Sequence, residues 1–216
     1  LTITGFLIAT STLAFLVFES SNDQTLGQLS GPGQLLAALF AAVTPRTAGF
    51  NTIDYAQATN ATLVLTILLM FVGGNSGSTA GGIKTTTFFV LAASVWSVIR
   101  GRADTVVFDR RIPPATVVRA GAITFAAVAI GGAGLTLLAL FEPEATLRDL
   151  MFESVSALGT AGLSTGVTPG LSASSKLVLV VLMFMGRIGS ISFALALVSR
   201  HRSTSLRFPA EEVVVG

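Results

Sequence analysis

Apolar residues fall in runs that are long enough to cross a membrane. Residues 1–18 and 115–141 are almost unbroken apolar stretches, and residues 174–199 form another that contains Arg187 near its middle. About 20 apolar residues in a helix cross the roughly 30 Å hydrocarbon core of a bilayer. The pattern therefore predicts three continuous membrane-spanning helices.

A fourth span is interrupted by glycine. Residues 61–72 and 83–99 are apolar, but the segment between them contains five glycines in ten residues. Each glycine costs about 1 kcal/mol relative to alanine inside a helix, so we expect a break with an irregular loop or hinge. A plain kink that allows close helix packing is the alternative. The segment reads Gly73, Gly74, Asn75, Ser76, Gly77, Ser78, Thr79, Ala80, Gly81 and Gly82.

Two further apolar segments are too short to cross. Residues 33–43 and 147–158 each give about three helical turns, which is roughly half a bilayer. Arginines gather on the connection after the broken span and on the C-terminal tail, whereas acidic residues gather on the opposite side. The positive-inside rule places the arginines, and the C-terminus, in the cytoplasm. With four spans, both short segments must then enter from outside and return, as re-entrant helices; surface helices of an extracellular cap are the alternative.

The chain contains an internal repeat. Residues 40–50 align with residues 152–163 once one gap is allowed, and Gly49 and Gly162 then lie 113 positions apart. Residues 74–78 align with residues 186–190 at a spacing of 112. The repeated unit is a span, a half-length helix, a Thr-Ala-Gly loop and a second span. The fold class expected is an all-α membrane protein made of two such units in tandem.

Composition supports this class and excludes others. Hydrophobic residues make up 51% of the 216 residues and charged residues only 11%, whereas soluble domains carry about 25% charged residues. The net charge is only +2, from 13 basic and 11 acidic residues, and no basic face accompanies it, so we expect no nucleic-acid partner. Cysteine is absent, which excludes disulfides and cysteine-based metal sites.

The Thr-Ala-Gly loops suggest cation binding by the main chain. Irregular backbone at membrane depth is tolerated only where protein or a water-filled cavity satisfies it, and glycine permits the positive φ that turns successive carbonyls the same way. Carbonyl dipoles favour K⁺ or Na⁺ without a formal charge. A small-residue motif for helix packing is the other reading. The candidate filter residues are Thr47, Ala48, Gly49, Phe50, Thr160, Ala161, Gly162 and Leu163.

The layout and three motifs resemble the Trk/Ktr/HKT superfamily of potassium transporters, most closely the Ktr membrane subunit. The motifs are residues 44–52, residues 73–85 and residues 186–190. The resemblance implies the third and fourth of four repeats around one K⁺ pore, with the first two repeats absent. The implied divisions are residues 1–100 for one repeat, 101–114 for a cytoplasmic basic loop, 115–200 for the other repeat and 201–216 for a cytoplasmic tail.

The resemblance also implies a gate and partners. Residues 73–82 would form a mobile gating loop beneath the filter, with Arg187 near the pore axis and able to anchor that loop by hydrogen bonds. Lys84 is a weaker gating candidate, because a lysine at this depth favours reaching towards the cytoplasmic interface. The full-length subunit would form a homodimer in the cell membrane on a cytoplasmic nucleotide-binding regulatory ring of RCK type. The partner, and not this chain, would bind the nucleotide, and Na⁺ could serve as a coupling or activating ion.

Two other functions fit parts of the sequence. Ser164, in a G-x-S-x-G motif, or Ser76 would be the nucleophile of an intramembrane serine hydrolase, with His201, the single histidine, as base. A scaffold subunit without transport is the second alternative. The transporter reading predicts no enzyme activity.

Overall fold

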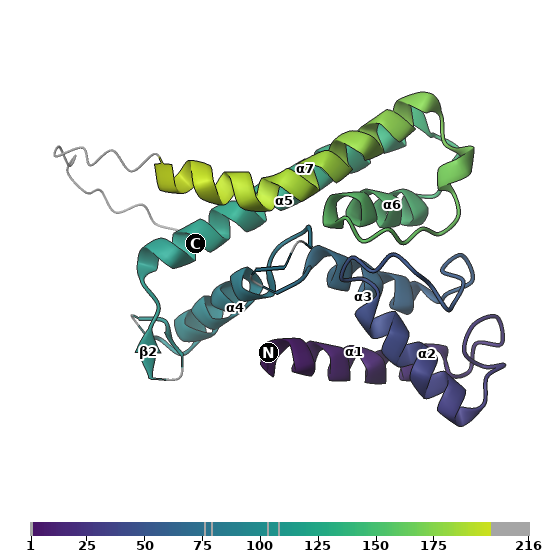
Figure 1. The fold of residues 1–216 in the computed structure, drawn as a ribbon, viewed down its shortest axis with the longest axis horizontal. Coiled ribbons are helices and arrows are strands. Elements are labelled where there is room, and N and C mark those ends of the chain that lie inside the picture. The colour runs from purple at the N-terminus through teal and green to yellow at the C-terminus, as the bar shows by residue number, and fades with distance from the viewer. Residues whose placement is uncertain (1, 76, 79, 103, 108, 200–216) are drawn as a thin grey trace.

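The computed structural model describes residues 2–199 except 76, 79, 103 and 108, and it describes side chains as far as residue 188 (Figure 1). Helices dominate this part of the chain. The elements in order are α1 (Thr2–Glu19), α2 (Gly31–Val43), α3 (Asn60–Phe71), α4 (Thr85–Ile99), β1 (Val106–Val107), β2 (Arg110–Arg111), α5 (Pro114–Phe141), α6 (Leu147–Gly159), a 3₁₀ turn (Thr168–Gly170) and α7 (Ala173–Ser199).

The same order of elements occurs twice. A long helix (α1 or α5) is followed by a 13-residue helix (α2 or α6), an irregular loop and then further helix. The short segments expected from the sequence are therefore helices, each slightly longer than predicted. Local sequence explains where they begin: Pro32 occupies the first turn of α2, and the side chain of Thr146 accepts a hydrogen bond from the Asp149 N–H at the start of α6.

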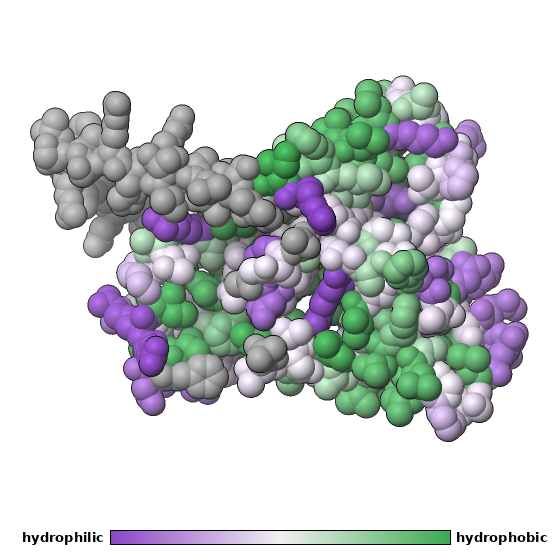
Figure 2. All heavy atoms as spheres, viewed as in Figure 1, coloured by the Kyte–Doolittle hydropathy of each residue, from purple (hydrophilic) through white to green (hydrophobic). Residues whose placement is uncertain are grey.

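Length and composition suit several helices to a membrane. Helices α1 and α5 are long and apolar enough to span one, whereas α2, α3 and α4 are shorter apolar helices. Large apolar side chains such as Phe6, Phe125 and Phe184 are about two-thirds exposed or more. Figure 2 shows apolar surface over α7 and around α1 and α2. A soluble protein rarely exposes apolar surface on this scale.

The fourth span is broken where its glycines predict. Helix α3 ends at Phe71 and α4 begins at Thr85. The chain leaves and re-enters through a neck of three backbone hydrogen bonds: Ile83 N–H to Phe71 O (3.0 Å), Gly73 N–H to Ile83 O (2.9 Å) and Thr85 N–H to Gly74 O (3.1 Å). We call residues 73–82 the glycine-rich segment.

The basic connection contains a small hairpin that the all-helical expectation missed. Strands β1 and β2 pair antiparallel, with Val106 opposite Arg111 and Val107 opposite Arg110. The valines favour extended backbone, and Asp109 adopts a positive φ of 59° at the turn. Two β-branched residues beside a tight turn were too short a signal to predict a strand.

Helix α6 lies at the centre of the described structure. On one side its Phe152 joins a core with Phe15 of α1 and Met70 of α3, all fully buried. On the other side its Leu150 and Ala157 pack with Leu138 and with side chains of α7. In Figure 1, α5 and α7 run side by side above α6, while α1 to α3 lie below it. The two halves of the chain therefore meet on α6.

Candidate ion-binding loops and glycine-rich segment

A hydroxyl at or near the C-terminal end of each short helix donates a hydrogen bond to a carbonyl of the following loop. We call residues 44–59 the first loop and residues 160–172 the second loop. Thr44 Oγ1 donates to Phe50 O in the first loop, and Ser156 Oγ donates to Leu163 O (2.6 Å) in the second. Both hydroxyl-bearing residues are buried. The bonds fold each Thr-Ala-Gly turn back against the end of its helix.

The Thr-Ala-Gly backbone has the same conformation in both loops. Thr47 and Gly49 have φ values of 72° and 75°, and Thr160 and Gly162 have values of 50° and 84°. The intervening alanines keep negative φ. The glycines adopt the left-handed backbone that the sequence predicts. The threonines do so as well, although a β-branched residue rarely does.

The two loops touch at their glycines. A Cβ placed on Gly49 would lie 3.2 Å from the Ala161 carbonyl oxygen, and a Cβ placed on Gly162 would lie 3.1 Å from the Cα of Gly49. These positions are tighter than ordinary van der Waals contact. The structure therefore brings together the two predicted groups of filter residues, 47–50 and 160–163.

Six carbonyl oxygens at this meeting point accept no hydrogen bond from the residues that the structure describes. Within the described part of the chain, no donor reaches the carbonyl oxygens of Thr47, Ala48, Gly49, Thr160, Ala161 or Gly162. The carbonyls of Phe50 and Leu163 differ, because each accepts a side-chain hydroxyl. Ala161 is buried and Thr47, Gly49 and Thr160 are partly buried, whereas Ala48 and Gly162 are exposed. These six oxygens are thus available to a cation or to water.

Glu153 is a buried acid held by its own loop. Its Oε1 accepts from Ser164 Oγ (2.5 Å) and from the Thr165 N–H (3.1 Å), and its Oε2 accepts from Thr168 Oγ1 (2.7 Å). The carboxylate thereby fixes the outer part of the second loop to α6. Ser164, the candidate hydrolase nucleophile, donates its hydroxyl hydrogen to this carboxylate. The other hydrolase candidates, Ser76 and His201, lie outside the described residues.

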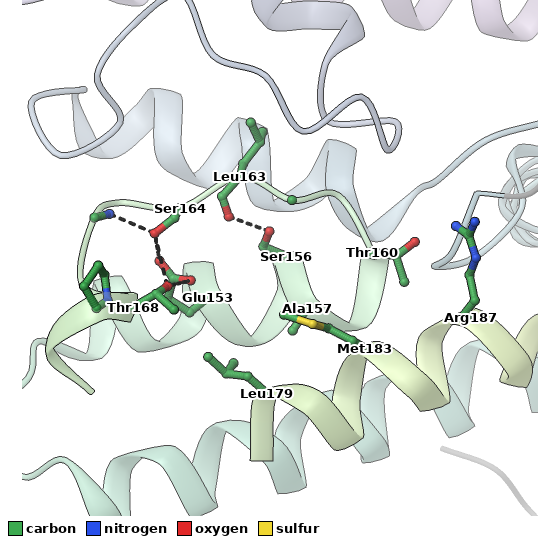
Figure 3. Close-up of a pocket in the computed structure, with 13 residues that line it drawn as sticks. Glu153, Ser156, Ala157, Thr160, Leu163, Ser164, Thr168, Leu179, Met183 and Arg187 are labelled. Carbon is green, nitrogen blue, oxygen red and sulfur yellow. Dashed lines mark hydrogen bonds between the residues drawn. The ribbon is translucent and has the colours of Figure 1, made fainter. Parts of the chain in front are cut away.

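A cavity of about 710 Å³ runs between α6, the second loop and α7. In Figure 3, Ser164 and Thr168 gather around Glu153 at one end, and Arg187 lies beside Thr160 at the other. The middle is lined by apolar side chains that include Leu179 and Met183. The second loop therefore forms one wall of a hollow whose two ends carry opposite charges.

Lys84 binds inside the glycine-rich segment. Its Nζ donates to the carbonyls of Ser78 (2.8 Å) and Ala80 (2.7 Å). The segment turns these two carbonyls towards the ammonium group, and a reach of Lys84 towards the cytoplasmic interface stays a prediction. A side-chain hydrogen bond also ties the segment to the start of α4, because Thr85 Oγ1 donates to Asn75 Oδ1 (3.1 Å). Of the predicted gating residues, Ser76 and Thr79 lie outside the described part of the chain.

Glycines let the segment pass close under α6. A Cβ on Gly81 would lie 2.6 Å from Thr160 Oγ1 and 2.8 Å from Gly159 O, and a Cβ on Gly73 would overlap the Gly81 carbonyl. From α7, a Cβ on Gly186 would overlap the Leu158 carbonyl. The C-terminal end of α6 is therefore enclosed by backbone from both halves of the chain. Gly82, with φ of 68°, turns the segment back towards α4.

Arg187 is exposed and close enough to Lys84 for their like charges to repel. No hydrogen bond joins Arg187 to the loop residues that the structure describes, so the expected anchoring bonds are not seen there.

Arg46, in the first loop, has a buried guanidinium group. Its three guanidinium nitrogens are buried and have no acceptor within the described part of the chain.

Sequence reasoning missed the residues that support the loops. Thr44 and Ser156 occupy matching places at the ends of the two short helices, and that correspondence could have marked them. The contacts of Gly159 and Gly186 could not be found in this way, because the first depends on how the two halves pack and the second on how α7 packs against α6. Among the described residues, no group of three or more His, Cys, Asp or Glu side chains is placed to hold a metal ion.

Comparisons with known proteins agree on one family. The family model described as TrkH, cation transport protein, matches residues 1–207. Ktr system potassium uptake protein B from Bacillus subtilis (strain 168) is 41% identical over 216 residues, which cover 100% of this chain and 48% of that protein. The protein of the same name from Vibrio alginolyticus is 38% identical over 213 residues, covering 99% of this chain and 46% of that protein.

The fold is also that of a solved transporter. The crystal structure of the potassium transporter TrkH from Vibrio parahaemolyticus matches with a TM-score of 0.68 and 24% identity, over 91% of this chain and 42% of that one. The chain thus spans about half the length of the relatives it matches. It belongs to the TrkH family of cation transport proteins, within the Trk/Ktr superfamily, and is a membrane-embedded protein.

Proposed function

We propose that this chain is half of the pore-forming membrane subunit of a potassium uptake system. K⁺ would shed part of its water and be coordinated by main-chain oxygens of the first and second loops. The relatives named as potassium uptake proteins support K⁺ as the transported ion. A relative named potassium/sodium uptake protein NtpJ, from Enterococcus hirae, supports Na⁺ as a second ion of the system.

The observation that carries this proposal is the set of six carbonyl oxygens without donors on two touching loops. Alternation between positive and negative φ can turn successive carbonyls to one side of the chain, where they can replace the hydration shell of a monovalent cation. Residues 47–49 and 160–162 both show the alternation. The hydroxyl bonds to Phe50 O and Leu163 O would mark the outer limit of the coordinating stretch.

Two repeats supply only part of a ring, so we infer that the complete protein contributes two more. Residues 1–100 and 115–200 would be the third and fourth repeats, with α2 and α6 as re-entrant pore helices. The buried guanidinium of Arg46 supports this view, because such a group requires acceptors and a missing half of the pore would provide them. The coverage of about half of each relative has the same implication.

The glycine-rich segment would be the gate. It lies against the α6 end that leads into the second loop, and Lys84 holds its tip folded through two carbonyls. Arg187 adds a second positive charge nearby. Two cationic groups beneath the loops oppose the passage of K⁺ by simple repulsion, so the segment must move for conduction.

Regulation would come from the cytoplasm. We propose a homodimer of full-length subunits on a nucleotide-binding ring of RCK type, with the C-terminus on the cytoplasmic side. The word "system" in the names of the Ktr relatives fits an assembly of several subunits. The hairpin between α4 and α5 is a candidate docking surface, because Arg110 and Arg111 are exposed on it. Anionic lipid headgroups could also bind there.

The filter is tested by Gly162→Ala in the full-length protein. A side chain at φ of 84° is strained by about 1–2 kcal/mol, and its Cβ would press on Gly49. We expect a roughly tenfold loss of K⁺ over Na⁺ discrimination, measured as a permeability ratio in proteoliposomes. Gly166→Ala is the matched control, since Gly166 has φ of 91° but open space around it. Equal ratios for the two variants would reject the filter.

The gate is tested by deletion of residues 75–80, which removes the tip and spares the neck. Basal K⁺ flux without the cytoplasmic partner should rise. A deletion variant that folds, as judged by size-exclusion chromatography, and conducts no more than the parent protein would show that the segment is not a gate.

A further inference from the structure

We propose that the Thr160 hydroxyl is the latch that holds the gate closed, so that one residue joins the gate to the ion-binding loop. The inference rests on the proposed function of the glycine-rich segment and gives that function a specific residue. It is carried by one hydrogen bond between the two halves of the chain, in which the Gly81 N–H donates to Thr160 Oγ1 (3.1 Å).

The bond connects the two parts whose states must be coordinated. Thr160 directly follows α6 and begins the second loop, and its own carbonyl is among the six without donors. Gly81 lies at the closing end of the glycine-rich segment, 79 positions earlier in the chain. A movement of the gate must therefore break or carry along a bond to the first residue of the ion-binding backbone.

The backbone of Thr160 is arranged for this contact. Its φ and ψ are 50° and 34°, and its N–H donates to the carbonyls of Ser156 and Ala157. A left-handed position that ends a helix is normally filled by glycine or asparagine, because a β-branched side chain is strained there. Strained backbone of this kind persists where the surrounding structure imposes it and often marks a functional position. Here the strained residue is the one that presents an acceptor to the segment.

The backbone of Gly81 is tightly packed on both sides, so the segment cannot shift there without breaking contacts. Gly81 is buried, and a Cβ on it would meet Thr160 Oγ1 at 2.6 Å and Gly159 O at 2.8 Å. On its other side the Gly81 carbonyl occupies the space that a Gly73 side chain would need. Two carbonyls that precede it, those of Ser78 and Ala80, accept hydrogen bonds from Lys84 Nζ. The segment is thus held from within by Lys84 and from the second loop by Thr160.

A shared residue makes the coupling reciprocal. If opening the gate shifts Thr160, it alters the carbonyl that K⁺ would use, and by thermodynamic linkage K⁺ in the loops changes the gate equilibrium by the same factor. The first loop offers an internal contrast. Thr47 has the equivalent left-handed position, but no hydrogen bond joins it to the glycine-rich segment in the described part of the chain.

The test removes the acceptor and keeps the shape. Thr160→Val in the full-length protein deletes the hydroxyl, and loss of one neutral hydrogen bond should shift the closed-to-open ratio about fivefold. We expect basal K⁺ flux without the cytoplasmic partner to rise by that factor. The rise should be larger than for Thr160→Ser, which keeps the acceptor, and larger than for Thr165→Val, which removes a hydroxyl of the second loop that has no hydrogen-bond partner among the described residues.

A double variant separates a latch from a damaged loop. In the protein that lacks residues 75–80, Thr160→Val should add no further rise, because there is no tip left to release. If Thr160→Val does not fold, Gly81→Ala replaces it, since its methyl group would push the segment off Thr160 Oγ1 and should also raise basal flux.

The outcomes distinguish the latch from the gate. If the deletion raises flux while Thr160→Val and Gly81→Ala do not, the gate stands and the latch is wrong. If Thr160→Val raises flux equally with and without the tip, the hydroxyl acts on the ion-binding loop alone and the latch is also wrong. If the deletion itself leaves flux unchanged, the proposed gate fails and takes the latch with it.

Discussion

The helical segments that follow the two loops share a sequence pattern but differ in structure. Residues 74–78 and 186–190 align within the repeat, yet the first segment is split into α3 and α4 by residues 72–84, while α7 continues through Gly186 and Arg187. The extra glycines at 73, 81 and 82 account for the break. The second half of the chain thereby keeps a continuous helix against α6, and the first half has an irregular segment at the same place.

The contrast teaches that glycine has two opposite uses here. Gly186 sits inside a helix, and its missing side chain lets α7 press its backbone against the Leu158 carbonyl. Gly82 interrupts a helix, since its φ of 68° cannot occur in one. Close packing holds the second repeat together, whereas conformational freedom allows the first to leave the helical path.

Gly186→Ala should have the largest effect on this comparison. Its Cβ would overlap a backbone carbonyl, which cannot rotate away as a side chain would, so α7 must move off α6. We expect a loss of roughly 2–3 kcal/mol in the free energy of unfolding, measured by thermal denaturation of the purified full-length protein in detergent.

Gly132→Ala in α5 is the matched control for that change. A Cβ there would meet nothing within 4 Å, and alanine is the better helix former by about 1 kcal/mol. Its melting temperature should stay level or rise. Similar losses for both variants would show that the α6–α7 contact is looser than described.

Lys84→Met comes next, because it acts on the segment that the second repeat lacks. It removes both hydrogen bonds from Nζ to the Ser78 and Ala80 carbonyls while keeping an unbranched apolar chain. We expect a several-fold rise in basal K⁺ flux, at about fivefold per lost bond or less. Lys176→Met is the control, since its Nζ also donates to a carbonyl, that of Pro169 (3.0 Å), but far from the segment in sequence. If basal K⁺ flux rises no more for Lys84→Met than for this control, Lys84 has no role in gating.

Local signals were enough to predict the elements but not their contacts. The apolar runs, the glycine break and the aligned Thr-Ala-Gly triplets predicted the helices, the interruption and the left-handed Gly49 and Gly162. They could not reveal that Thr47 and Thr160 are left-handed too, because β-branched residues favour the opposite assignment. Nor could they show that Lys84 donates to the Ser78 and Ala80 carbonyls, because these carbonyls face its ammonium group only after the segment has folded.

The two halves of the chain also share a carboxylate contact at the C-terminal ends of their long helices, α1 and α5. Glu19, at the end of α1, accepts from the Thr59 N–H and hydroxyl (both 2.8 Å) at the start of α3. Glu142, at the end of α5, accepts from the Ser172 N–H (2.6 Å) and from Ser175 Oγ (2.8 Å) at the start of α7. Each carboxylate ties the helix before a loop to the helix after it. Nothing in the spacing showed this, because the two glutamates lie at different distances from their loops.

Glu142 gives the smallest predicted effect and a dependence on pH. The Ser172 N–H, with the Ser172 and Ser175 hydroxyls, lowers the pKa of Glu142 below its usual value of about 4.3. A lowered pKa in the folded state means that the carboxylate stabilises the fold above the ordinary pKa and loses this contribution as the pH falls through the lowered one. We expect Glu142→Gln to reduce the melting temperature slightly at pH 7 and to flatten its fall below about pH 4.3.

Glu144→Gln serves as the comparison, because Glu144 is exposed and accepts no hydrogen bond in the described part of the chain. Its pH profile should follow that of the parent protein. Overlapping profiles for the two variants would mean that the Glu142 contacts do not bear on stability.

The contact between the two loops at Gly49 and Gly162 restricts both halves of the chain at once. A side chain on Gly49 would press on the Ala161 carbonyl oxygen (3.2 Å), and a side chain on Gly162 would press on the Cα of Gly49 (3.1 Å). Neither glycine can gain a side chain unless the opposite loop shifts. The helices that follow the loops are under no such mutual restraint, since α7 runs on without a break whereas the aligned segment is interrupted between Phe71 and Thr85.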